Sequence, residues 1–207
     1  MYRTLLLIAL GSAILMPSAS FGAEHKLVQT WIDENQARVD YRKLLVIAIT
    51  DDRSTRRNFE NKFVSYLRGR KVDGMTSHSL VASLSEVEDR TRILNTIAEQ
   101  RVDSAITVRL VPLKETTEEE WGEIWEESLR KDATVRVLIE ETLPVSPVRS
   151  RRFGVEVALW DTTTGGRVWA GRSDVYKRKE LGSEAGNFVT MVMQTLQKTN
   201  LLSGEGR

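Results

Sequence analysis

The amino-acid sequence predicts an α/β (α+β) fold, in which a mixed β-sheet carries helices packed mainly on one face. Two observations support this fold class. In the first half of the chain, short apolar runs alternate with segments of helical periodicity, as in βα units. In the second half, two segments of alternating apolar residues flank a Gly-containing turn and precede an amphipathic helix. The predicted order is β-α-β-α-β-insertion-β-β-β-α.

The first half of the chain supplies the predicted βα units. Residues 43–50 (KLLVIAIT) contain six consecutive apolar residues, which is typical of a strand buried on both faces. Apolar side chains then recur at helical spacing up to Gly69. A short strand over 75–81, a second helix and a third strand over 102–110 complete this half.

The segment 114–132 interrupts this pattern and is predicted to be an insertion on the domain. It holds seven Glu, and Trp121, Trp125 and Leu129 recur at helical spacing. We therefore expect a helix with one narrow aromatic and aliphatic stripe on an acidic surface. The two indoles either form an exposed contact patch or pack back onto the domain.

The rest of the chain is predicted to be antiparallel, with a basic, Pro-containing connection over 143–152. Three strands are expected, over 133–142, 153–160 and 167–176. The turn DTTTGG joins the last two, because Asp, Thr and Gly favour turns. An amphipathic helix starting near Leu181 closes a single domain over 43–200, and 201–207 is expected to be a flexible tail.

The first 22 residues have the order of a secretory signal peptide. Arg3 precedes an uncharged apolar run over 5–15, and Pro17 and small residues follow up to Gly22. The run is shorter than the roughly 20 residues that span a bilayer. We therefore expect export to the periplasm without a permanent membrane span. The lead-in over 23–42 is either a loop or a short edge strand.

Composition limits the kinds of partner. The chain has 30 Lys and Arg against 29 Asp and Glu, and one of the cations, Arg3, belongs to the predicted signal peptide. The remainder is balanced at 29 against 29, without the positive field typical of nucleic-acid binders. Cysteine is absent, so the chain has no disulfide and no thiol for a lipid anchor.

The partner-binding surface predicted from the sequence has two parts. Trp121 and Trp125 would form an aromatic pair ringed by Glu, and aromatic residues are enriched where proteins contact one another. Arg149, Arg151 and Arg152 form a basic run that either attracts the acidic insertion or meets an anionic partner.

A second candidate site follows the first predicted strand. Asp51 and Asp52 stand at its carboxyl end, where open α/β sheets place ligands. These carboxylates either cap the following helix, bind a cation or a polar ligand, or act with His78 in a hydrolase. The sequence predicts no metal or cofactor: it has two His, and its Glu cluster lies on a predicted helix, whereas calcium sites arrange oxygen ligands around a turn. The motifs G-x-S-x-G, H-E-x-x-H and C-x-x-C do not occur.

The chain resembles a group of uncharacterised bacterial envelope proteins, often lipoproteins. The resemblance rests on KLLVIAITDD, on the final amphipathic helix and on a phrase of the type L-(Y/W)-D-x-x-T-G-x-x-V-W over Leu159–Trp169. The order of elements is also similar to the α/β domain of the curli secretion channel protein, of penicillin-binding-protein activator lipoproteins and of the Tol propeller protein's N-terminal domain. This resemblance implies a fold and partner binding, and it transfers no catalytic residue.

We therefore expect an exported accessory protein of the bacterial cell envelope that acts through protein–protein contacts and not as an enzyme. The alternative is a periplasmic hydrolase or a small-ligand-binding protein that uses the Asp51 and Asp52 region. Self-association, by analogy with the channel-forming relative, is a third expectation.

Overall fold

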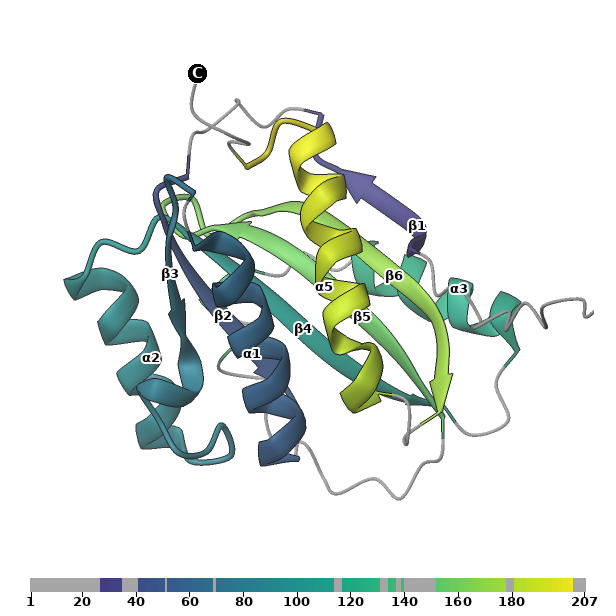
Figure 1. The fold of residues 1–207 in the computed structure, drawn as a ribbon, viewed down its shortest axis with the longest axis horizontal. Helices are drawn as coiled ribbons and strands as arrows, with labels where there is room; N and C mark the ends of the chain where they lie inside the picture. Colours follow the sequence, from purple (N-terminus) through teal and green to yellow (C-terminus); the bar gives the residue numbers. More distant parts are fainter. Residues whose placement is uncertain are drawn as a thin grey trace, which may run out of the picture.

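A mixed six-stranded sheet forms the centre of the molecule (Figure 1). The computed structural model describes residues 27–34, 41–50, 52–68, 70–113, 117–130, 134–136, 139, 152–177 and 181–202. The strands are β1 (Leu27–Ile32), β2 (Lys43–Ile49), β3 (Asp73–Thr76), β4 (Ser104–Leu113), β5 (Arg152–Asp161) and β6 (Arg167–Lys177). The longer helices are α1 (Arg53–Leu67), α2 (Val87–Glu99), α3 (Glu118–Arg130) and α5 (Leu181–Lys198). The predicted α/β fold with a mixed sheet is confirmed.

The strand order is β1-β6-β5-β4-β2-β3. β2 pairs in parallel with β3 and β4, and the pairs β4–β5, β5–β6 and β6–β1 are antiparallel. β2 lies between two neighbours and under helices on both sides, so six of its seven residues are buried. Of the two alternatives for the lead-in, the structure has the edge strand, β1.

The predicted placement of helices mainly on one face is wrong. In Figure 1, α1 and α5 lie side by side in front of the sheet, whereas α2 and α3 pack on its other face. β2 shows this division, because Leu44 and Val46 join the α1–α5 core whereas Leu45 and Ile47 join the α2–α3 core. The crossover from β2 to β3 and the return from β3 to β4 run in opposite directions. Two right-handed crossovers of opposite direction must use opposite faces.

Two predicted strands differ from the structure. β3 is short and leads into a turn of 3₁₀ helix, η1 (Ser77–Ser79), within the predicted strand over 75–81. The strand predicted over 133–142 is wrong where the structure describes it, since Val135, Arg136 and Ile139 are helical. Val135 and Ile139 are both buried and stand four residues apart, the spacing of one helix face.

The predicted hairpin is confirmed, and the phrase over Leu159–Trp169 builds its turn. Asp161 accepts hydrogen bonds on Oδ1 from the backbone N–H groups of Thr163 at 2.8 Å and Thr164 at 2.9 Å. Gly165 has a φ of 76°, which a glycine adopts at little cost. The Asp, Thr and Gly of this phrase therefore have a structural role, namely to close the turn between β5 and β6.

Several predicted segments lie outside the described residues. These are the signal peptide over 1–22, most of the connection over 143–152 and residues 203–207 of the tail. Among the residues that are described, no helix combines the length and apolar character needed to cross a membrane.

Tyr176 of β6 gives a pH-dependent prediction. Its ring is 1% exposed and meets Phe188 of α5 edge-on, with the ring centroids 6.5 Å apart. Burial raises the pKa of the phenol well above its usual value, and the carboxylates of Asp174 and Glu184 add to this rise. Above about pH 10 the unfolded chain releases this proton whereas the folded chain keeps it. The free energy of unfolding should therefore fall as the pH rises through this range.

Denaturant unfolding between about pH 9 and pH 11 measures this effect. Tyr176→Phe lacks the phenol, so its free energy of unfolding should fall less steeply with pH than that of the wild type. Equal slopes in the two proteins would show that Tyr176 does not contribute to the alkaline loss of stability.

Candidate functional site at the carboxyl ends of β2 and β3

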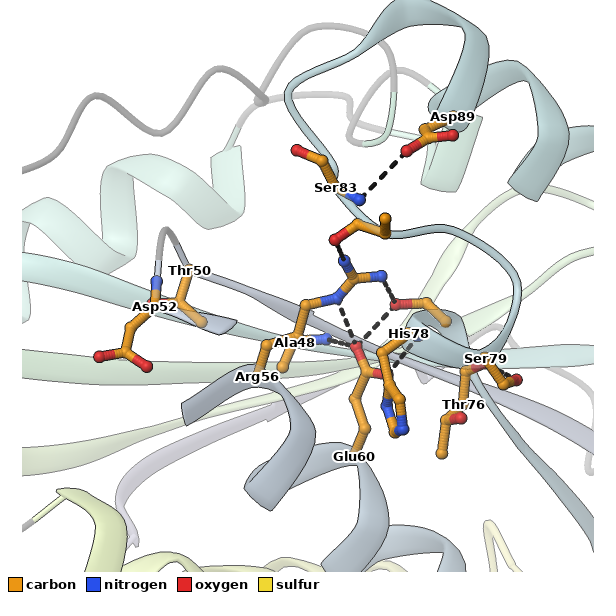
Figure 2. Close-up of polar contacts among 12 residues, drawn as sticks. Ala48, Thr50, Asp52, Arg56, Glu60, Thr76, His78, Ser79, Ser83 and Asp89 are labelled. Carbon is orange, nitrogen blue, oxygen red and sulfur yellow. Dashed lines mark hydrogen bonds and ion pairs between the residues drawn. The ribbon is translucent and has the colours of Figure 1, made fainter. Parts of the chain in front are cut away.

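A buried polar cluster lies where β2 and β3 end, and Glu60 of α1 is at its centre (Figure 2). The Glu60 side chain is 0% exposed. Its Oε1 accepts hydrogen bonds from the Ala48 backbone N–H at 3.0 Å, from Arg56 Nε at 3.2 Å and from the Ser77 hydroxyl at 2.6 Å. Its Oε2 accepts from the backbone N–H of His78 and from the ring Nδ1, both at 2.8 Å. Five donors thus occupy both oxygens of one carboxylate.

Local sequence explains how this cluster forms. Asp52 caps α1, because its Oδ1 accepts the Thr55 backbone N–H at 2.8 Å. Arg56 and Glu60 follow one turn apart on the same side of the helix. The turn η1 after β3 then brings Ser77 and His78 onto the Glu60 carboxylate. Of the alternatives for Asp52, the structure has the helix cap.

A small pocket of about 130 Å³ adjoins the cluster. Thr50, Arg53 and Arg56 line one side of it, and the segment 82–85 lines the other. The chain leaves β2 towards α1 on one face of the sheet and leaves β3 towards α2 on the other face. This divergence of neighbouring chains is the topological switch point at which open α/β sheets bind ligands.

Arg56 is held rigidly at the pocket wall. The residue is 3% exposed, and besides Glu60 its guanidinium contacts Ser77 Oγ at 2.7 Å and the Ala82 carbonyl oxygen at 3.5 Å. On the opposite wall the backbone N–H of Ser83 donates to Asp89 Oδ2 at 3.1 Å, as Figure 2 also shows. The cation is therefore positioned before any ligand arrives.

The cluster contains a serine, a histidine and an acid, but it is not a catalytic triad. The Ser77 hydroxyl donates to Glu60 and accepts from Arg56, and the residue is 0% exposed. A serine nucleophile needs a general base within hydrogen-bond reach and access to substrate. An ionised Glu60 carboxylate only accepts hydrogen bonds, which assigns a ring proton of His78 to Nδ1. Glu60 thus orients His78 and Ser77 separately.

The hydrolase alternative needs Asp51, Asp52 and His78 to converge, and the structure does not bring the described members together. The Asp52 carboxylate is exposed and caps α1, whereas the His78 ring contacts Glu60. Figure 2 shows Asp52 and His78 on opposite sides of Arg56. Asp51 lies outside the described residues.

The predicted exposed aromatic patch on the 114–132 segment is wrong. The segment forms the helix α3, but Trp121 is 0% exposed and Trp125 is 3% exposed. The Trp121 Nε1–H donates to the Ser173 carbonyl oxygen at 2.9 Å. The Trp121 ring lies against Gly154 of β5, where a Cβ would stand 2.4 Å from its Cε2 atom. The structure thus has the other alternative, in which both indoles pack back onto the domain.

The basic run is described only at its last member. Arg152 is exposed and begins β5, opposite Lys177 of β6. Arg149 and Arg151 lie outside the described residues, so an anionic partner at this run stays a prediction. In the part of the chain that the structure describes, no three His, Asp or Glu side chains gather as a metal site would require.

Comparisons with known proteins give only distant likenesses. No protein-family model matches the chain, and no curated protein sequence matches it. Among solved structures it is similar to PelC from Paraburkholderia phytofirmans, described as a dodecamer. A point variant of PelC is 16% identical with a TM-score of 0.42, covering 81% of this chain and 96% of PelC. A second PelC structure is 15% identical with a TM-score of 0.41, covering 86% and 97%. The function of this chain therefore has to be inferred from its own residues.

Proposed function

We propose that this chain is an exported, non-enzymatic binding protein of the bacterial cell envelope that holds a small ligand with an oxyanion group in the pocket beside Arg56. Export rests on the order of residues 1–22. The predicted protein contacts through Trp121 and Trp125 are not part of this proposal, because both rings are buried. We therefore assign ligand binding to the pocket at the carboxyl ends of β2 and β3. Self-association stays a prediction of the family resemblance.

The observation that carries this proposal is the lining of the pocket. Arg53 and Arg56 line it together with the hydroxyl side chains of Thr50, Ser83 and Ser85. Guanidinium groups bind carboxylate and phosphate through paired, charge-assisted hydrogen bonds, and hydroxyls add further donors. Since Arg56 is already ordered by Glu60, a ligand loses little affinity to the ordering of this side chain.

The size of the pocket limits the ligand. About 130 Å³ is roughly the volume of four liquid water molecules. A carboxylate or phosphate group fits such a space, and the rest of a larger ligand would extend into solvent. The first turn of α1 begins beside the pocket at Arg53, and its positive end favours an anion there.

The same contacts support binding over catalysis. Glu60 has hydrogen-bond donors on both oxygens, so it can ligate a metal ion only by losing existing hydrogen bonds. Ser77 is buried and bonded at the same carboxylate. The pocket thus offers donors and positive charge to a ligand, while the nearby acid serves to hold Arg56.

Titration of the full chain with sodium phosphate and with acetate tests the proposal, followed by the backbone amide NMR signals of Thr50 and 83–85. We expect saturable shifts in the wild type. Arg53→Ala should bind at least about 10-fold more weakly, because it removes a charged donor from the pocket.

Arg57→Ala is the matched control, since Arg57 is exposed on the same helix and does not line the pocket. It removes the same charge and should bind like the wild type. If both variants lose the same affinity for the anion, the loss reflects the overall charge of the protein and not a contact in the pocket. An absence of saturable shifts in the wild type would overturn the proposed ligand class.

A further inference from the structure

A second concave surface lies at the opposite end of β3, between the C-terminal end of α1 and the start of the strand. Its volume is about 580 Å³, within the range of small-molecule sites. Four cationic side chains line it, from Arg42, Arg68, Arg70 and Lys71, against the single carboxylate of Asp73. We call these five residues and their surface the basic concavity.

The chain assembles this charge from two segments. α1 ends at Leu67, and the residues that lead from it into β3 bring three of the cations. Arg42 comes from the segment before β2, and its carbonyl oxygen accepts the backbone N–H of Asp73 at 2.8 Å. α1 packs close to β3 here, because Gly74 has no Cβ; one would stand 2.9 Å from Leu67 Cδ1. The concavity is therefore part of the packed fold.

Arg70 is held by Tyr66 at the end of α1. Its guanidinium carbon lies 4.1 Å from the centroid of the Tyr66 ring, and its Nη1 donates to the Tyr66 carbonyl oxygen. Its Nε is buried and has no hydrogen-bond partner among the described residues. A cation that has lost part of its solvation is stabilised by a nearby anion more than a fully solvated one is.

We propose that the basic concavity is a binding site for a phosphate group. The whole chain has almost equal numbers of cations and carboxylates, so four cations against one carboxylate is a local excess. Clustered like charges repel, and a multivalent oxyanion removes that repulsion while accepting hydrogen bonds from several arginines. This site is separate from the pocket beside Arg56 and has no residue in common with it.

The phosphate has two sources, a soluble phosphorylated molecule or a lipid headgroup, and two probes distinguish them. Inorganic pyrophosphate represents the soluble source, and its binding is followed by the NMR amide signals of residues 70–74. Vesicles of phosphatidylglycerol, compared with phosphatidylcholine, represent the membrane source and are followed by co-sedimentation. Both are measured on the full chain at about 0.05 M and 0.15 M salt, because screening weakens contacts with exposed charges.

Arg68→Ser/Lys71→Ser removes two exposed cations of the concavity. Arg57→Ser/Lys62→Ser is the matched control, since it removes two exposed cations of α1 that do not line the concavity. Pyrophosphate affinity should fall at least about 10-fold in the first variant and stay near the wild-type value in the second. The fold of both variants is intact if their midpoints of thermal unfolding equal that of the wild type.

The vesicle measurement assigns the source. The source is a lipid headgroup if the wild type sediments with phosphatidylglycerol vesicles but not with phosphatidylcholine vesicles. Arg68→Ser/Lys71→Ser should then lose this sedimentation, and the control variant should keep it. Pyrophosphate binding without vesicle binding indicates a soluble ligand. The proposal is wrong if both double variants lose the same affinity, or if the wild type binds neither probe. It is also wrong if pyrophosphate shifts only the signals of Thr50 and 83–85.

Discussion

Replacing Trp121 with alanine should destabilise the protein by about 3–5 kcal/mol, the usual cost of deleting a fully buried Trp side chain. The ring is 0% exposed and fills the space that Gly154 leaves open on β5. Its loss would leave a cavity between α3 and the sheet, and the Ser173 carbonyl oxygen would lose the indole donor. Chemical denaturation followed by circular dichroism measures the free energy of unfolding.

Ile124 of the same helix provides the control for this prediction. Its side chain is 43% exposed, so Ile124→Ala should change the free energy of unfolding by less than about 0.5 kcal/mol. Trp121→Ala/Trp125→Ala should abolish cooperative unfolding or lower its midpoint further. A double variant as stable as the wild type would contradict the packing of α3 and restore the two indoles as a contact surface.

Glu60→Gln should cost a similar amount, about 3–5 kcal/mol, although the two side chains are almost the same size. The five groups that surround the carboxylate donate hydrogen bonds, and an amide NH₂ would face some of them with a second donor. Arg56, which is 3% exposed, would lose the negative charge that compensates it. Thermal and denaturant unfolding measure this loss.

Glu123→Gln makes the same chemical change at an exposed position of α3 and should be nearly neutral. A double-mutant cycle with Arg56→Gln then isolates the pair. If Glu60 mainly compensates Arg56, the double variant should lose less stability than the sum of the single variants. Additive losses would mean that the contacts of Glu60 to the backbone and to His78 dominate.

The sequence predicted those parts of the fold that local pattern determines. β2 has the continuous apolar run of a buried strand, and the β5–β6 hairpin has both alternation and turn residues. The faces occupied by the helices could not be predicted in the same way, because they depend on the order of strands in space. That order places β2 between β3 and β4. The strand predicted over 133–142 failed because a short apolar pattern there also fits a helix.

The candidate site was only partly visible in the sequence. Asp52 correctly indicated the end of β2 and the start of a helix. Arg56 and Glu60 have the spacing of an ordinary surface ion pair, and nothing in the sequence indicates their burial. Ser77 and His78 reach Glu60 only after β3 pairs with β2. The Trp121 and Trp125 stripe was located correctly on a helix, but the partner of that stripe, Gly154, lies on a distant strand.

The position of β1 determines the order in which the sheet is completed. β1 is the first described strand of the chain, and its neighbour in the sheet is the last, β6, with Leu27 opposite Ser173. During synthesis β1 therefore stays unpaired until β6 has been made. The side chains of Val28 and Ile32 are exposed even in the complete fold. Bringing such distant segments together costs loop entropy and slows folding. A chain that has not yet reached β6 can thus fold no more of the sheet than the part from β5 to β3.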